Sequence, residues 1–228
     1  MLLAVDCGNT NIVFALYDGD SQQANWRIST DPKRSADEYL VWLTQLMALN
    51  GVIVDELSDM IIANVVPELQ PKLISLAQDG LNLIPQVIGD ENIDLGIEIN
   101  IDQPNQAGAD RLVNAVAARD LYDLPAIVLD FGTATTFDLV GRGGSYDGGI
   151  IAPGVNLSVE ALYLAAARLP RLAVEPWESD MPILGKDTVS AMQSGIFWGY
   201  VSMVEGLIGR LRRDYGAHLP VIATGGLA

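Results

Sequence analysis

The chain has 228 residues, half of them hydrophobic, and its 29 acidic and 13 basic side chains give a formal net charge of −16. This length fits one large domain or two of about 100 residues, and the acidic balance argues against nucleic-acid binding, which needs clustered Lys and Arg. No apolar run reaches the roughly 18 residues of a membrane span, and the start MLLAVDCGNT lacks the basic region of a signal peptide. We therefore expect a cytoplasmic protein that binds neither membranes nor nucleic acid.

The scarcity of cysteine and histidine restricts the possible chemistry. Cys7 is the single cysteine and His218 the single histidine, which rules out intrachain disulfides, thiolate clusters and His-rich metal sites. A Ser-His-Asp triad would have to use His218, which has no recognisable nucleophile elbow to serve. Any chemistry must come from carboxylates, hydroxyls, backbone amides and bound ions.

The first half of the chain predicts strands that alternate with helices. Three strands joined by short turns come first, and a helix then begins at the capping box Ser35–Glu38 and ends at Asn50-Gly51. Residues 92–107 are polar and irregular, which is typical of a functional loop. The other expected elements are strands at 2–7, 11–18, 24–30, 59–64 and 84–88 and a helix at 67–79.

The second half repeats this plan. Its expected helices are 108–122, 157–168 with Asn156 as the cap, and a long one from Asp187 or Thr188 to about Asp214. Its expected strands are 125–130, 133–140, 146–153 and 220–224. The pattern predicts a duplicated α/β unit, with one domain at 1–107 and a second at 108–228.

The first strand of each half runs into Asp-x-Gly and then Asn or Thr, with Asp6 and Asp130 at matching places. A glycine at the strand end lets the backbone turn with its N–H groups outward, and such amides beside short hydroxyl side chains bind phosphate oxygens. The carboxylate suits a cation that bridges to the phosphates. Two such turns facing one another would clamp a polyphosphate across a cleft between the halves.

Simpler interpretations exist for the same residues. β-turns often carry Asp and Gly by chance, Asp6 would serve as a turn cap, and Cys7 as a small buried side chain. Asp138, on the second hairpin strand, reads as an ordinary strand acid. The competing phosphate motifs, the P-loop and G-x-G-x-x-G between a strand and a helix, are absent.

With this pair of turns the sequence resembles the actin, sugar-kinase and Hsp70 superfamily of two-domain phosphotransferases, and more narrowly the type III pantothenate kinases. The resemblance implies duplicated ribonuclease H-like (actin-like ATPase) domains, each with a mixed sheet flanked by helices, and a cleft between them. The implied activity is ATP-dependent phosphorylation of pantothenate to 4′-phosphopantothenate, which begins coenzyme A synthesis. The matching stretches, in the family's order, are DCGNTNIV (6–13), GADRLVNAVAA (108–118), DFGTATTFD (130–138), GGIIAPG (148–154), KDTVSAMQSG (186–195) and ATGGLA (223–228).

The resemblance also implies roles for single residues. Asp110 matches the general base that accepts the proton of the pantothenate hydroxyl, and Asp130 matches a ligand of a monovalent cation, K⁺ or NH₄⁺. Mg²⁺ should accompany the nucleotide. The implied ATP contacts are Asp6, Cys7, Gly8, Asn9, Thr10, Asn11 and Thr133, and the implied pantothenate contacts are Gly108, Ala109, Asp110, Arg111 and Thr188. Without the family, Asp110 and Arg111 would equally be a helix N-terminal acid beside a surface base, and Thr188 a helix cap.

Two features depart from the family pattern. The family usually has a tyrosine seven residues before the glycine of GADR, where this chain has Ile101, so we expect either a rebuilt acceptor pocket or a lowered affinity for the acceptor. The sequence stops at Ala228, where family members continue with a helical tail, so we expect the second domain to be truncated.

The family's acceptor site is completed across a subunit interface, so we expect a homodimer. The long helix from Thr188 supports this expectation with an apolar stripe, although the stripe would equally pack within its own monomer. Two rival functions stay open, a non-catalytic ATP-binding transcriptional accessory regulator on this scaffold and a kinase for another small alcohol. The stripe consists of Met192, Ile196, Tyr200, Met203 and Leu207.

Overall fold

The computed structural model describes residues 1–166, 169–175, 177 and 182–228. It contains two compact units. The first comprises Met1–Ile97 and Asp102–Ala117, and the second comprises Glu98–Ile101 and Ala118–Ala228. The functional division between residues 107 and 108 stays a prediction, because compactness alone does not define a functional domain.

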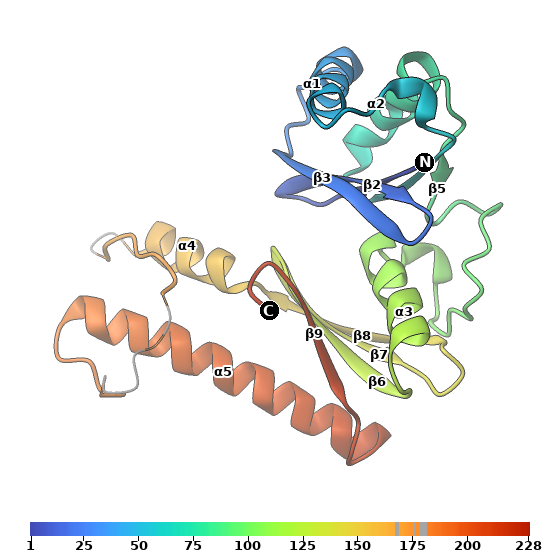
Figure 1. The fold of residues 1–228 in the computed structure, drawn as a ribbon. Helices are drawn as coiled ribbons and strands as arrows, with labels where there is room; N and C mark the ends of the chain where they lie inside the picture. The colour runs from blue at the N-terminus through green and yellow to red at the C-terminus, as the bar shows by residue number, and fades with distance from the viewer. Residues whose placement is uncertain (167–168, 176, 178–181) are drawn as a thin grey trace. The chain divides into compact units, whose positions relative to one another are not determined.

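The first unit has a five-stranded sheet in the order β3-β2-β1-β4-β5. The antiparallel meander β1–β3 is the expected one, and β4 and β5 continue the sheet with parallel pairing. Helices α1 and α2 lie over one face of this sheet (Figure 1). The elements are β1 (Leu2–Cys7), β2 (Asn11–Asp18), β3 (Ser21–Ser29), α1 (Ala36–Leu49), η1 (Val54–Glu56), β4 (Asp59–Asn64), η2 (Pro67–Leu69), α2 (Gln70–Ser75), η3 (Leu76–Gly80), β5 (Gln86–Val87) and η4 (Pro104–Gln106).

The helix expected at 67–79 is divided into three short pieces, η2, α2 and the π-helical turn η3. Pro71 explains the first division, because it has no N–H to donate to the carbonyl of Pro67 one turn earlier. The predicted segment is therefore helical, but it consists of three short pieces and not of one continuous α-helix.

The second unit has a four-stranded sheet in the order β8-β7-β6-β9. It repeats the first sheet, because β6–β8 form an antiparallel meander and β9 pairs parallel to the first strand of that meander. Helix α3 begins in the first unit and ends in the second. The elements are α3 (Ala109–Leu121), β6 (Ala126–Phe131), β7 (Ala134–Val140), β8 (Tyr146–Pro153), α4 (Val155–Ala165), α5 (Thr188–Tyr215) and β9 (Val221–Gly225). Within the described ranges, no helix is both long and apolar enough to cross a bilayer.

Alternate side chains along the strands are buried, and these side chains form the two hydrophobic cores. In β1, Leu3, Val5 and Cys7 point into the first core, where they meet Leu43 and Met47 of α1. In the second unit, Ile127, Leu129, Phe137 and Leu139 form a core on one sheet face, and Met203 and Leu207 of α5 pack against it. The C-terminal part of the predicted apolar stripe therefore packs within its own unit.

The start of α4 differs from the prediction. Gly154, and not Asn156, caps this helix, which runs from Val155 to Ala165; residues 167–168 of the predicted range lie outside the described residues. The N–H of Gly154 donates to the carbonyl of Thr133 at 3.1 Å, and a Cβ at this position would lie 2.3 Å from the same oxygen. The helix begins where the chain leaves this close backbone contact, which a residue with a side chain could not make.

Part of the segment predicted as a loop extends the second sheet. Ile99 forms a parallel bridge with Tyr146 at the start of β8. The N–H of Tyr146 donates to Glu98 O and the N–H of Asn100 to Tyr146 O, both at 2.8 Å. Ile101 follows directly, and its Cγ2 would be 3.4 Å from a Cβ placed on Gly148.

Gly225, at the end of β9, occupies a position without room for a side chain. Its φ is +95°, and a Cβ would lie 2.5 Å from Asp130 Oδ1 and 2.6 Å from Phe131 N. The next residue, Gly226, has open space at the same place.

We expect Gly225→Ala to lower the free energy of unfolding by about 1–3 kcal/mol, the usual cost of a strained backbone position. Gly226→Ala is the matched control and should change it by less than about 0.5 kcal/mol. Thermal melts followed by circular dichroism would measure both, at roughly 2–4 °C per kcal/mol for a chain of this length. Equal melting temperatures for the two variants would contradict the steric argument.

Candidate active site

The first Asp-x-Gly turn links β1 to β2 through Gly8, Asn9 and Thr10. The N–H of Gly8 donates to Asn11 O at 3.0 Å and closes the turn. Asn9 and Thr10 are exposed, as is Asp6 at the preceding strand end. In the described part of the chain, no backbone carbonyl accepts a hydrogen bond from the Asn9 N–H. The turn thus presents a carboxylate, an amide donor and short polar side chains on one exposed stretch.

Cys7 differs from its neighbours in this turn because its side chain is fully buried in the first core. Burial, with a smaller contribution from the charge of Asp6, raises the pKa of the Cys7 thiol to about 12. The thiol therefore stays protonated at neutral pH and is no nucleophile. The simpler interpretation of the side chain as a small core residue is confirmed, and only the backbone of Cys7 can face a ligand at the turn.

The second turn repeats the first in a slightly shorter form. The N–H of Gly132 donates to Ala134 O at 3.0 Å, as Gly8 does in the first turn. Gly132 and Thr133 are exposed at the tip, and Asp130 lies two residues before the turn glycine as Asp6 does. The Asp130 carboxylate lies beside Gly225 of β9.

Helix α3 begins directly after Gly108, and Asp110 and Arg111 lie in its first turn. Asp110 Oδ1 accepts a hydrogen bond from the Arg111 N–H at 2.8 Å. Helix N-termini offer unpaired N–H groups and a favourable dipole to anionic side chains, so this helix end suits a carboxylate. Among the described residues Asp110 accepts no other hydrogen bond, and the half-exposed carboxylate keeps Oδ2 available for a ligand.

Asp138 is not the ordinary strand acid that the sequence suggested. It is fully buried, and it accepts hydrogen bonds from Tyr146 Oη at 3.1 Å and Thr136 Oγ1 at 3.0 Å. Thr136 and Asp138 lie two residues apart on β7, so they share a sheet face with Asp130 on the paired strand β6. The polar character of this face was not apparent in the sequence, because Tyr146 comes from another strand.

Thr188 is the first residue of α5, but it is not the cap of this helix. The cap is Asp187, whose Oδ1 accepts from the Ser190 N–H at 3.0 Å, and this hydrogen bond holds the pKa of Asp187 below its usual value. Thr188 lines one end of a groove of about 760 Å³ between α4 and α5.

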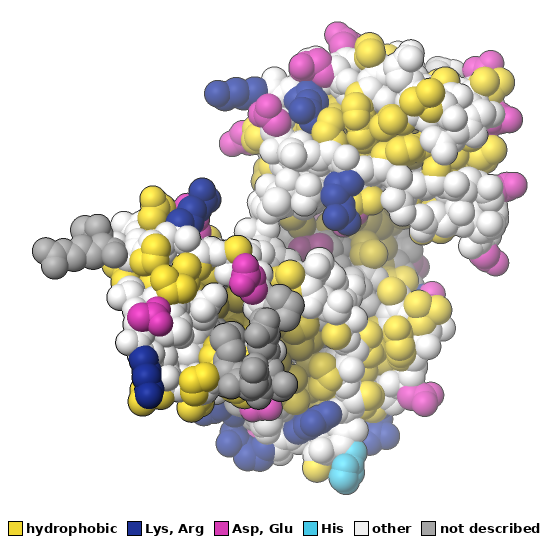
Figure 2. Space-filling view, turned by 60° about the vertical axis from the view of Figure 1, so that its left-hand side comes forward, with side chains coloured by type: hydrophobic (Ala, Val, Ile, Leu, Met, Phe, Trp, Pro, Cys, Tyr) yellow, Lys and Arg dark blue, Asp and Glu magenta, His cyan; other side chains and the backbone are white. Residues whose placement is uncertain are grey.

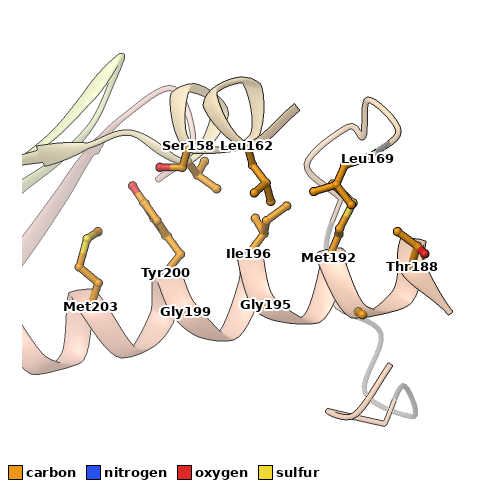
Figure 3. A pocket seen from close by; sticks show the side chains of 12 residues that line it. Ser158, Leu162, Leu169, Thr188, Met192, Gly195, Ile196, Gly199, Tyr200 and Met203 are labelled. Carbon is orange, nitrogen blue, oxygen red and sulfur yellow. The ribbon is translucent and has the colours of Figure 1, made fainter. Parts of the chain in front are cut away.

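The wall of this groove is mostly apolar (Figure 3). Tyr200 and Ile196 of α5 point toward Ser158 and Leu162 of α4, and Met192 points toward Leu169. The hydroxyl of Tyr200 is hydrogen-bonded to Thr135 Oγ1 on β7. The N-terminal part of the predicted apolar stripe therefore lines a groove between two helices of the same unit.

No group of three or more His, Cys, Asp or Glu side chains converges on one point within the described residues. On the face drawn in Figure 2, acidic side chains lie singly rather than in one cluster. A cation at Asp130 would therefore be held by no more than two carboxylates, with backbone carbonyl oxygens and a ligand's own oxygens as the other donors. That all-oxygen donor set fits K⁺ or Mg²⁺.

The structure gathers the predicted residues into local sites. Residues 6–11 span the first turn, and residues 108–111 lie at the start of α3. Asp130 precedes the second turn, Thr133 lies at its tip, and Thr188 lies at the groove. Sequence reasoning assigned no role to Thr30, Gly154 and Gly226, whose hydrogen bonds support the two turns. Gly154 and Gly226 lie in stretches that match the family, whereas Thr30 lies in none of them.

Solved structures of known proteins share this fold. A putative Baf family transcriptional activator from Campylobacter jejuni matches with a TM-score of 0.55 at 19% identity, over 98% of this chain and 90% of that one. The activator of 2-hydroxyisocaproyl-CoA dehydratase from Clostridium difficile, with bound ADPNP, matches with a TM-score of 0.54 at 12% identity, over 99% and 80%. At such identities the likeness concerns the fold alone, which is the actin-like ATPase and sugar-kinase fold.

Sequence comparisons identify relatives with much higher identity than these solved structures have. A type III pantothenate kinase of Paramagnetospirillum magneticum is 54% identical over this whole chain and 86% of its own length. Those of Rhodospirillum rubrum and Caulobacter vibrioides are 52% and 51% identical, over 88% and 87% of their own lengths. The family profile described as type III pantothenate kinase matches residues 2–210. The chain therefore belongs to the type III pantothenate kinase family.

Proposed function

We propose that this chain is a transferase that phosphorylates pantothenate with ATP, giving 4′-phosphopantothenate in the first step of coenzyme A synthesis. The observation that carries the proposal is the family match over residues 2–210, joined to the repeated Asp-x-Gly turn in both units. A kinase of this family uses ATP with a divalent metal, for which we propose Mg²⁺. We also propose a cytoplasmic location, because such an enzyme acts on small soluble metabolites.

In this proposal the ATP phosphates contact the first turn, from Asp6 to Asn11, and Thr133 of the second. Neither turn contains Lys or Arg, so backbone amides and hydroxyls are the donors to the phosphate oxygens. We propose that Asp130 holds a K⁺ or NH₄⁺ ion. A cation there supplies positive charge that offsets repulsion between the carboxylate and the polyphosphate.

Asp110 is the proposed general base. Its carboxylate takes the proton of the pantothenate hydroxyl as that oxygen bonds to the γ-phosphorus and the bond to the bridging oxygen of ADP breaks. The Arg111 N–H on Oδ1 orients the carboxylate, which leaves Oδ2 for the hydroxyl. Gly108, Ala109, Arg111 and Thr188 are the proposed contacts that position the acceptor.

The test of the whole proposal is phosphorylation of pantothenate by the purified chain with Mg²⁺ and ATP, beside a panel of other small alcohols. Turnover of pantothenate alone supports the proposal, and turnover of a different alcohol identifies another small-alcohol kinase. ATP binding without any turnover supports the transcriptional accessory regulator instead. Ile101, where the family has tyrosine, makes the KM for pantothenate the informative constant.

We expect Asp110→Asn to lower kcat by about 10²–10⁴-fold, the usual contribution of a general base. The amide keeps the size of the side chain but cannot accept the proton. Asp120→Asn is the matched control, because Asp120 is an exposed acid near the other end of α3. Steady-state kinetics, ATP titration and thermal melts would separate the roles. A folded variant with parental kcat would remove Asp110 from the mechanism, and a large loss of stability would point to a structural role.

We expect activity to require K⁺ or NH₄⁺, and Asp130→Asn to reduce both the rate and its response to K⁺. Removing the carboxylate removes the charge that would hold the ion. Initial rates in K⁺, Na⁺ or choline chloride at equal ionic strength separate specific binding from screening. Equal rates of the parent chain in all three salts would show that the cation assignment is wrong.

We propose that the protein is a homodimer, and light scattering at micromolar concentration should give twice the mass of one chain. Membership of the family supports this proposal. So does α5, on which large apolar side chains are exposed, with relative accessibilities of 41% for Val189 and 36% for Trp198. A single-chain mass across a dilution series would contradict this proposal.

A further inference from the structure

We infer that Thr30 is a positioning residue for the first phosphate-binding turn. It holds the carbonyl groups of Gly8 and Thr10, so that the amides of Asn9 and Asn11 turn toward the nucleotide. The inference rests on the proposed function, in which residues 6–11 contact the ATP phosphates.

Thr30 makes two hydrogen bonds to the turn from outside it. It directly follows β3, the neighbour of β2 in the sheet. Its Oγ1 donates to Gly8 O at 2.6 Å, and its N–H donates to Thr10 O at 3.0 Å. One residue at the end of the third strand therefore binds the carbonyl groups at both ends of the exposed tip.

The planarity of the peptide unit converts this restraint into an orientation of donors. In a trans peptide, a carbonyl oxygen and the amide hydrogen of the next residue point in opposite directions. With the carbonyls of Gly8 and Thr10 directed toward Thr30, the N–H groups of Asn9 and Asn11 are directed away from it. Convergent amides of this kind make an anion site, and the Asn9 N–H has no backbone acceptor in the described residues.

The tip of the turn lies at the surface, and Thr30 contacts it from a neighbouring strand. Asn9 and Thr10 are exposed, and the bond from Gly8 N–H to Asn11 O joins the two ends of the turn. A site that is ordered before binding avoids the entropy cost of ordering on binding. Loss of the hydroxyl should therefore weaken ATP binding more than it slows the chemical step.

Thr30→Val removes the hydroxyl while keeping the branched shape of the side chain. We expect the Kd for ATP and Mg²⁺, measured by calorimetry, and the KM for ATP to rise roughly three- to tenfold, the effect of one neutral hydrogen bond. The kcat and the KM for pantothenate should change by less than about twofold, since uniform binding is what is lost. Thr30→Ser restores the hydroxyl and should recover most of the ATP affinity.

Thr44→Val is the matched control. Thr44 lies on α1 of the same unit, and its Oγ1 donates to Leu40 O at 2.8 Å, so the substitution deletes a similar bond away from the turn. It should leave the Kd for ATP unchanged. If Thr30→Val does not fold, Thr30→Ala provides the second deletion of the same hydroxyl.

The outcomes separate this inference from the proposed function. If the folded Thr30→Val variant binds ATP as the parent does, or if Thr30→Ser fails to recover affinity, Thr30 does not position the turn and the kinase proposal stands. If Thr44→Val weakens ATP binding equally, the effect is general destabilisation and the inference is wrong. Failure of the unmodified chain to bind ATP contradicts the proposed function itself.

Discussion

The bond from the turn glycine's N–H to a carbonyl across the hairpin is the interaction on which both candidate phosphate sites depend. It closes the link between β1 and β2 in one unit and between β6 and β7 in the other. In each unit the strand before the turn lies between an antiparallel and a parallel neighbour. The carboxylates of Asp6 and Asp130 therefore project from strands held on both edges, which is how a rigid scaffold supports a functional loop.

The net charge of −16 means that the chain as a whole repels a polyphosphate, which is also negatively charged. In the proposed function, both turns offer backbone dipoles, whose positive ends need no basic side chain, and carboxylates that would attract counter-cations. In that proposal, bound cations rather than arginine side chains balance the charge of the nucleotide.

Much of the fold could be predicted from local sequence signals, because they have local causes. The Ser35 capping box is an example, with Glu38 N–H to Ser35 Oγ at 3.2 Å and Ser35 N–H to Glu38 Oε2 at 2.7 Å. The unpredicted features depend on neighbours distant in the chain. Gly154 displaces Asn156 as a cap because of Thr133, and Asp138 is buried because Tyr146 reaches it from β8. The Thr30 hydroxyl had no sequence signal, since nothing near it in the chain indicates its acceptor.

The two turns have the same closing bond but different supports. In the first, the Thr30 hydroxyl donates to Gly8 O, beside backbone bonds from Thr30 N–H to Thr10 O and from Val65 N–H to Cys7 O. In the second, the N–H groups of Gly154 and Gly226 donate to Thr133 O and Phe131 O. Backbone support requires close approach, so side chains are excluded at Gly154 and Gly225, whereas a hydroxyl reaches its acceptor across a longer path. A substitution at Thr30 therefore removes one of several bonds to the first turn, whereas a side chain at Gly154 or Gly225 would displace the backbone beside the second.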